Sequence, residues 1–273
     1  MTFREVDAKR SGWARPLRSV SLLVGIVLWL LFLLPPFFSW ARRYEFVQAL
    51  QYCMFAFWVP TLITVDAPWA RLGLTSGEAY GITPSGDRVT PLHLKWLDRI
   101  QLARSRVSGH RRVVVTGFVF VLLEVFWRVA VMVDQSVLHP WLFVVESLSL
   151  VIAGVSFMTN LIESPPLHPA TTRPHRLAAS AVAMWAVWIV AYLDGMSSNS
   201  WYHVFVHVAG RGLSQSADQQ FSAAAMWIVS ASVFIPIVFW NLGHWLKTEE
   251  DPSDELYEMV REERNRGFFG TTD

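Results

Sequence analysis

The sequence has little charge and almost no cysteine. Only 16% of its 273 residues are charged, whereas 53% are hydrophobic, and it contains 14 Trp and 18 Phe. A soluble domain of this length carries more charge and fewer tryptophans. The one cysteine, Cys53, excludes an intrachain disulfide. The composition therefore indicates a protein whose main solvent is the lipid bilayer.

Common functional motifs are missing as well. The sequence has no glycine-rich phosphate loop, no H-E-x-x-H and no G-x-S-x-G, and no candidate nucleophile stands next to a base. The basic residues form no tract of their own, so nucleic acid is not an expected partner. No internal repeat of the transporter kind is visible. We predict that the protein is not an enzyme.

Six stretches are long and apolar enough to cross a hydrocarbon core, which needs about 20 residues in a helix. They are too uniformly apolar for barrel strands. We therefore predict an all-α, polytopic transmembrane helix bundle over residues 19–246. Pro35-Pro36 should end or bend the first span, and Pro60 and Pro236 should kink the second and sixth. The expected spans are 19–40, 46–65, 112–134, 140–161, 177–195 and 219–246.

Lysine and arginine are distributed unevenly between the connecting segments. The two tails and the even-numbered loops hold nineteen of them, and the other loops hold only Arg42, Arg43 and Arg211. By the positive-inside rule, both termini are predicted to be cytoplasmic. Residues 1–18 would then form a basic cytoplasmic tail, 66–111 a cytoplasmic loop and 247–273 a charged tail helix.

The 66–111 loop ends in a basic amphipathic pattern, with Leu92, Trp96 and Ile100 at helical spacing. This pattern predicts a helix. It either lies on the anionic cytoplasmic leaflet or is a plain solvated loop helix.

Three charged residues, Glu124, Arg128 and Glu146, lie well inside the expected spans, away from their ends. A charge at the bilayer centre costs about 2.5–3.5 kcal/mol on insertion scales, so each needs a partner or a purpose. Glu124 and Arg128 are four residues apart, which places them on one helix face. They form either a self-neutralising pair or part of a proton or ligand pathway. Glu146 is either a protonated, hydrogen-bonded core residue or faces an outer cavity.

Three histidines lie on the side predicted to be outside. His203 and His207, four residues apart, could present both imidazoles to one ion, and His139 could join them. Such ligands would suit copper. The same histidines, flanked by Trp201 and Tyr202, also fit the aromatic belt of a membrane surface.

Three stretches resemble the multi-spanning CtaG family, whose members are implicated in assembling cytochrome c oxidase. One runs from Gln48 to Trp69 and ends in an Ala-Pro turn. Another opens with Glu146-Ser147 and leaves through Pro165-Pro166. The most specific opens with Asp218-Gln219-Gln220 and continues to Met226-Trp227. Together these stretches cover most of residues 44 to 250.

The resemblance implies a bundle fold, but the histidines that the family carries on the first two stretches are replaced. The matching positions are Gln48, Tyr52 and Ser147, whereas Glu146, Asp218 and Gln219 match. The resemblance therefore does not carry over a histidine site. Either this chain uses His203 and His207 instead, or it binds no metal.

The resemblance implies an assembly factor for a haem-copper oxidase in a bacterial plasma membrane. Its partners would be the bilayer and oxidase subunits, with assistance in copper delivery at the outer face. One alternative is an accessory protein of the respiratory chain without metal binding. Another is a small-ion or metal transporter, in which Glu124, Arg128 and Glu146 would line the path.

Overall fold

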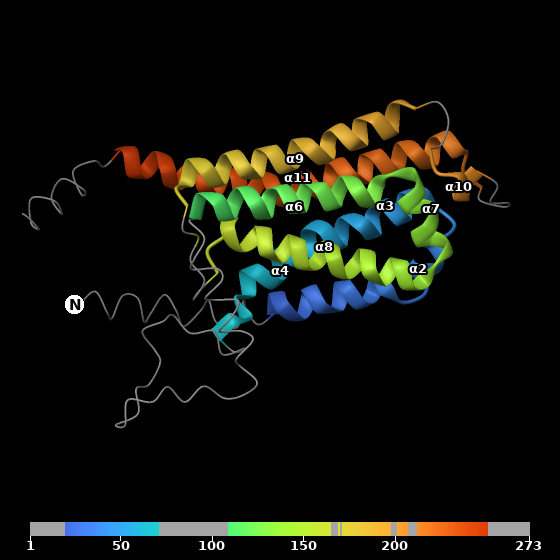
Figure 1. Ribbon diagram of the computed structural model, residues 1–273, viewed down its shortest axis with the longest axis horizontal. Coiled ribbons are helices and arrows are strands. Elements are labelled where there is room, and N and C mark those ends of the chain that lie inside the picture. The colour runs from blue at the N-terminus through green and yellow to red at the C-terminus, as the bar shows by residue number, and fades with distance from the viewer. Residues whose placement is uncertain are drawn as a thin grey trace, which may run out of the picture.

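The computed structural model describes residues 20–70, 109–164, 169, 171–197, 201–206 and 212–250. This part of the chain is helical and contains no strand. Its long helices run side by side in an elongated bundle (Figure 1). The prediction of an all-α fold is confirmed for these residues. The amphipathic helix predicted in the 66–111 loop lies outside the described residues, and the predicted 247–273 tail helix lies largely outside them.

The chain begins with an apolar helix, Val20–Leu33. The following elements are α2 (Phe37–Ala41), α3 (Glu45–Cys53), the π-helix η1 (Met54–Trp58), α4 (Val59–Asp66) and the 3₁₀ turn η2 (Pro68–Ala70). After these come α6 (Gly109–Arg128), α7 (Ala130–Leu138), α8 (Pro140–Leu161), α9 (Arg173–Met196), α10 (His203–Val206) and α11 (Gln215–Glu250).

Four continuous helical segments are long and apolar enough to cross a membrane. They are Glu45–Asp66, Pro140–Leu161, Arg173–Met196 and Gln215–Lys247. The bent pair α6 and α7 makes a fifth if the two are counted as one span. The described part of the first predicted span is the shorter helix Val20–Leu33. The chain is thus a multi-pass helical membrane protein, and the number six remains a prediction.

The span predicted over 112–134 is divided between two helices. α6 ends at Arg128, Val129 is extended, and α7 departs at 71°. Because of the break, Arg128 and Asp134 can each form hydrogen bonds with other segments at this end of the bundle, as described below. A continuous helix would have directed both along a single axis.

The prolines act in three different ways. The first helix ends at Leu33, just before Pro35-Pro36, as predicted. Pro60 has no N–H for the carbonyl one turn earlier, and the backbone before it widens into the π-helix η1. By contrast, α11 continues as helix through Pro236.

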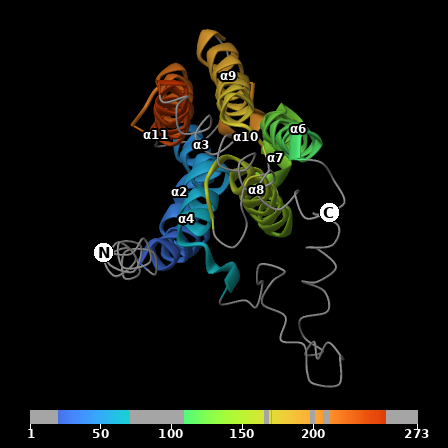
Figure 2. The ribbon, with the colours of Figure 1, turned by 90° about the vertical axis from the view of Figure 1, so that its left-hand side faces the viewer.

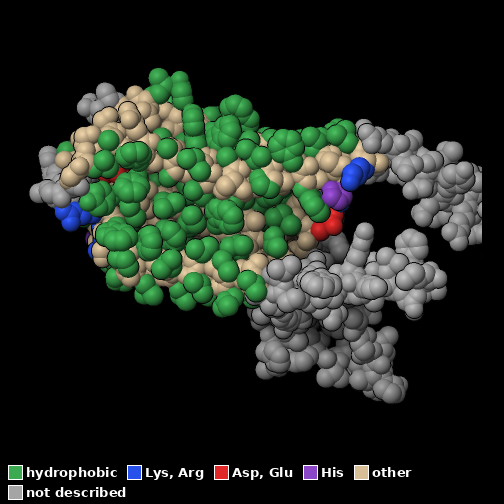
Figure 3. All heavy atoms as spheres, turned by 180° about the vertical axis from the view of Figure 1, so that it is seen from behind, with side chains coloured by type: hydrophobic (Ala, Val, Ile, Leu, Met, Phe, Trp, Pro, Cys, Tyr) green, Lys and Arg blue, Asp and Glu red, His purple; other side chains and the backbone are tan. Residues whose placement is uncertain are grey.

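Aromatic side chains fill the interior, while the exterior is also apolar. Phe55, Phe57 and Phe120 are fully buried. Outside, Val114 and Ile228 are 68% and 69% exposed. Hydrophobic side chains cover the visible face of the bundle, and the charged ones lie at its two ends (Figure 3). An apolar outer surface of this kind fits hydrocarbon rather than water.

Two groups of helix pairs build the bundle, which Figure 2 shows end-on. α11 packs along α9 and α3, and α8 packs along α6 and the η1–α4 segment. We call one end the Arg128 end, because α6 and α9 finish there and α3, α8 and α11 begin there. We call the opposite end the basic end, because α6 and α9 begin there with Arg111, Arg112, Arg173 and Arg176.

The contact between α8 and the segment η1–α4 depends on Gly154. A Cβ atom on Gly154 would lie 2.5 Å from Cγ of Pro60 and 2.8 Å from the carbonyl oxygen of Ala56. Both distances are too short for real atoms, and one of the neighbours is backbone. Glycine therefore permits the two helices to approach at this point.

We expect Gly154→Ala to destabilise the bundle by about 1–3 kcal/mol, because the added methyl group overpacks a fixed contact. Thermal unfolding in detergent would measure this as a lowered midpoint. Gly243→Ala is the matched control, since a Cβ on Gly243 in α11 meets no atom within 4 Å. A midpoint for Gly154→Ala equal to that of Gly243→Ala would contradict the prediction.

Candidate polar site at the Arg128 end

A buried arginine organises the Arg128 end. Arg128 is the last residue of α6 and is 3% exposed. Its guanidinium donates to Oε1 of Gln48 at 2.7 Å and to Oδ2 of Asp194 at 3.1 Å. A third contact, at 3.4 Å, reaches Oγ of Ser222. One cation thus joins helices α3, α6, α9 and α11.

Asp194 is the counter-ion, and it is held by further polar groups. Ser222 donates to its Oδ2 at 3.1 Å, and Nε2 of Gln219 donates to its backbone oxygen at 2.6 Å. The Arg128 and Asp194 side chains are 1% and 0% exposed. A buried pair is stable only when such additional hydrogen bonds offset the loss of hydration.

Two tyrosines enclose the guanidinium. It lies 5.7 Å from the ring centroid of Tyr52 and 4.9 Å from that of Tyr202. The Tyr52 hydroxyl donates to the backbone oxygen of Glu124 at 3.1 Å, and the Tyr202 hydroxyl donates to that of Arg128 at 3.4 Å. Arg128 is the last residue of α6, so its carbonyl has no intrahelical N–H, whereas the carbonyl of Glu124 lies one turn earlier. Burial raises the pKa of Tyr202 well above its usual range, so the hydroxyl remains a neutral donor.

Asp218 performs a different task at the same end. Its two carboxylate oxygens accept the backbone N–H groups of Glu45 at 2.9 Å and Phe46 at 3.0 Å. Both donors are in the first turn of α3, where helical N–H groups have no internal partner. Asp218 in α11 therefore caps α3 from across the bundle, with a charge that suits the helix dipole.

The expected Glu124–Arg128 ion pair does not form. Arg128 is directed to Asp194, and among the described residues neither carboxyl oxygen of Glu124 has a hydrogen-bond partner. Glu124 is 2% exposed. Glu146 is equally buried, and Ser136 lies within hydrogen-bonding reach of it. Both glutamates lie inside the bundle rather than on its surface.

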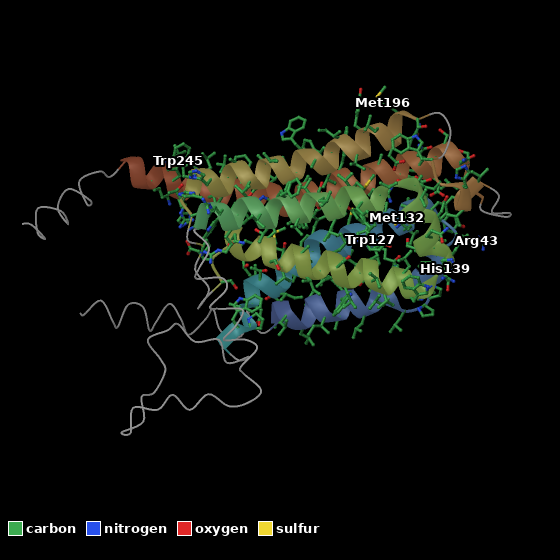
Figure 4. The ribbon with its side chains drawn as sticks, in the orientation of Figure 1. Arg43, Trp127, Met132, His139, Met196 and Trp245 are labelled. Carbon is green, nitrogen blue, oxygen red and sulfur yellow. The ribbon has the colours of Figure 1, made fainter. Side chains whose placement is uncertain are left out.

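The candidate metal ligands are only partly described. The His203 ring lies with Nδ1 3.3 Å from Oδ2 of Asp134, and its side chain is 90% exposed. Asp134 also accepts the N–H groups of His203 and Val204, which cap α10. His139 lies in the turn between α7 and α8 (Figure 4). His207 lies outside the described residues, and the residues that are described include no group of three His, Cys, Asp or Glu placed to hold a metal ion.

The positions that match the family histidines do not fit a copper ion. Gln48 is hydrogen-bonded to the guanidinium of Arg128, and Tyr52 lies against the same guanidinium. Ser147 accepts a hydrogen bond from Nε1 of Trp29 at 2.6 Å. Amide and hydroxyl oxygens are poor copper ligands, and the fixed positive charge beside Gln48 and Tyr52 repels a second cation.

Asp194 was not predicted as the partner of Arg128. Sequence spacing indicates neighbours within one helix, and the neighbour of Arg128 at i, i+4 is Glu124. The available signal was that Asp194 and Gln219 both lie at ends of expected spans on the same predicted side. A buried arginine requires a carboxylate on some neighbouring helix, and Asp194 met that condition.

The comparisons with known proteins place most of the chain in one family. The family model described as cytochrome c oxidase caa3 assembly factor matches residues 1–248. No curated protein and no solved structure gave a match.

We expect Arg128→Met to lower the stability of the folded protein by about 3–5 kcal/mol, because it leaves the Asp194 carboxylate buried without its counter-ion. Thermal unfolding in detergent would show the loss. Adding Asp194→Asn should restore part of it, since the orphaned charge is then removed. Arg43→Met, at an exposed arginine of the same end, is the control. Equal midpoints for the two single variants would refute a structural role of the pair.

Proposed function

The chain belongs to the cytochrome c oxidase caa3 assembly factor family, and we propose that it assists assembly of a haem-copper oxidase from within a bacterial plasma membrane. The observation that carries this proposal is the extent of the match, residues 1–248, which includes the described helices except the last two residues of α11. The role is one of binding oxidase subunits rather than of catalysis. In support, the buried polar groups at the Arg128 end are largely directed at one another, as an architectural cluster requires.

We further propose a six-span topology with both termini in the cytoplasm. The six spans would be the four long apolar helices, the bent pair of α6 and α7, and the helix that includes Val20–Leu33. The concentration of arginine at the basic end supports a cytoplasmic position for that end. The Arg128 end would then lie at the outer leaflet, where the metal centres of an oxidase subunit could be reached.

Deletion of the gene should reduce the amount of assembled oxidase, measured by haem absorption spectra of membranes and by immunoblotting of its subunits. Wild-type protein should restore both. Arg128→Met should restore them in proportion to the folded protein present, and Arg43→Met fully. Normal oxidase content in the deletion strain would exclude the assembly role.

A finer proposal concerns copper as cargo. His203 is exposed beside Asp134, and His207 and His139 are the further ligands proposed for the same end. Imidazole and carboxylate groups at a solvent-accessible end could receive an ion and release it, which a closed buried site could not. This proposal places copper handling on the surface, away from the arginine cluster.

Titration of purified protein with Cu(I) in detergent would test the copper proposal. We expect binding by the wild type, and at least about a tenfold weaker affinity for His203→Ala/His207→Ala, equivalent to roughly 1.4 kcal/mol. His139→Ala should weaken binding by a smaller factor. His244→Ala, near the opposite end of α11, is the control. If no copper binds, the accessory role without metal is favoured, and equal binding by the double variant would place the ligands elsewhere.

A further inference from the structure

A groove of about 380 Å³ runs along the outside of the bundle between α6 and α9. The two helices lie side by side (Figures 1 and 2). The floor of the groove is formed by Val113, Phe157 and Ala183, which are buried. Its rims carry Phe118 and Val182, which are 66% and 65% exposed. The groove is therefore open to whatever surrounds the bundle, and over most of its length that is lipid.

Small residues create the groove. Gly117 in α6 and Ala178 and Ala179 in α9 line it, where larger side chains would close it. A Cβ on Gly117 would already lie 3.1 Å from Cε2 of Phe157. The volume falls within the range of about 300–1,000 Å³ usual for small-molecule sites. A whole transmembrane helix, roughly 10 Å across, is too wide for such a space.

The length of the groove corresponds to one leaflet. Its lining on α6 extends from His110 to Val121. At about 1.5 Å per residue this is roughly 16 Å. Half of a hydrocarbon core of about 30 Å is nearly the same length. One extended acyl chain would thus reach from the membrane surface to the midplane within the groove.

Two histidines stand at the end of the groove where α6 and α9 begin. The rings of His110 and His175 are 4.3 Å apart between centroids. Nδ1 of His175 is 2.6 Å from the Thr172 hydroxyl. The other ring nitrogen of His175, Nε2, is therefore the one proposed to contact a ligand. These are the polar side chains of an otherwise apolar lining.

The surroundings of the histidine pair are positively charged. The first turns of α6 and α9 contain no acidic residue. The nearby carboxylate of Glu163 is engaged by Arg173 at 2.7 Å and lies 3.6 Å from Arg176. Both helices also direct their positive dipole ends to this place. An anionic headgroup complements this charge.

We propose that the groove binds one anionic phospholipid, with an acyl chain along Gly117 and the headgroup phosphate at His110 and His175. The proposal adds a lipid site to the assembly role and does not depend on it. The bound lipid would fill the space between α6 and α9 and hold the basic end at the membrane surface. Apolar lining fixes the chain, and the imidazole N–H groups and nearby arginines select the charge.

Native mass spectrometry of the full chain in detergent, with phosphatidylglycerol and phosphatidylcholine of identical chains, would test this. The wild type should retain one phosphatidylglycerol and bind phosphatidylcholine at least about tenfold more weakly. Val182→Phe and Ala178→Phe, which fill the groove, should lower phosphatidylglycerol affinity about tenfold. His110→Gln/His175→Gln should reduce the preference for phosphatidylglycerol, and the remaining preference is assigned to the nearby arginines.

Ile189→Phe is the matched control for Val182→Phe. Ile189 is 55% exposed on the same helix, two turns further on and outside the lining. Its lipid retention should equal that of the wild type, and the unfolding midpoints of the two variants should agree. Unchanged binding by both groove variants would overturn the site, and equal binding of the two lipids by the wild type would overturn the anionic headgroup. Groove variants that keep the lipid but lose a copurifying oxidase subunit would identify a protein as the occupant and also overturn it.

Discussion

A guanidinium inside an apolar bundle needs a counter-ion and hydrogen-bond acceptors, and the way in which Arg128 obtains them fixes the arrangement of four helices. Its partners come from α3, α9 and α11, so none of these helices can shift along its axis without losing a contact to the cation. The hydrophobic effect provides no such register in a membrane, because lipid is as apolar as the helix surfaces. Directional polar contacts therefore define the structure at this end.

The same arginine explains why α6 stops where it does. A helix that ends inside a bundle leaves carbonyl groups without donors, which is costly away from water. Here the Tyr202 hydroxyl, from the segment before α10, donates to the carbonyl of Arg128, the last residue of α6. Asp134 in α7 in turn holds α10 by its N-terminal N–H groups. The break at Val129, the short α10 and the arginine cluster are thus parts of one arrangement.

The sequence was sufficient to predict the helices but not the partners of their polar residues. Hydropathy located the long apolar segments within a few residues, because a run of about 20 apolar residues is typical of a membrane-spanning helix. It could not show that the run breaks at Val129, next to an arginine whose partners are distant in the sequence. Likewise, spacing suggested Glu124 as the partner of Arg128, whereas Asp194 lies 66 positions away along the chain. Pairings between helices depend on packing, which a single sequence does not display.

The arginine cluster also bears on how an assembly factor of this kind can work. Two of the positions that match the family histidines, Gln48 and Tyr52, lie against a permanent cation here, so they serve the architecture of the bundle. Arginine stays charged under all physiological conditions and cannot be exchanged during a reaction cycle. The proposed transfer of copper would then use groups that solvent and partner can reach, such as the exposed ring of His203. In this chain the buried site gives the bundle its shape, and the proposed recognition of a partner would fall to the surface of the helices and to their ends.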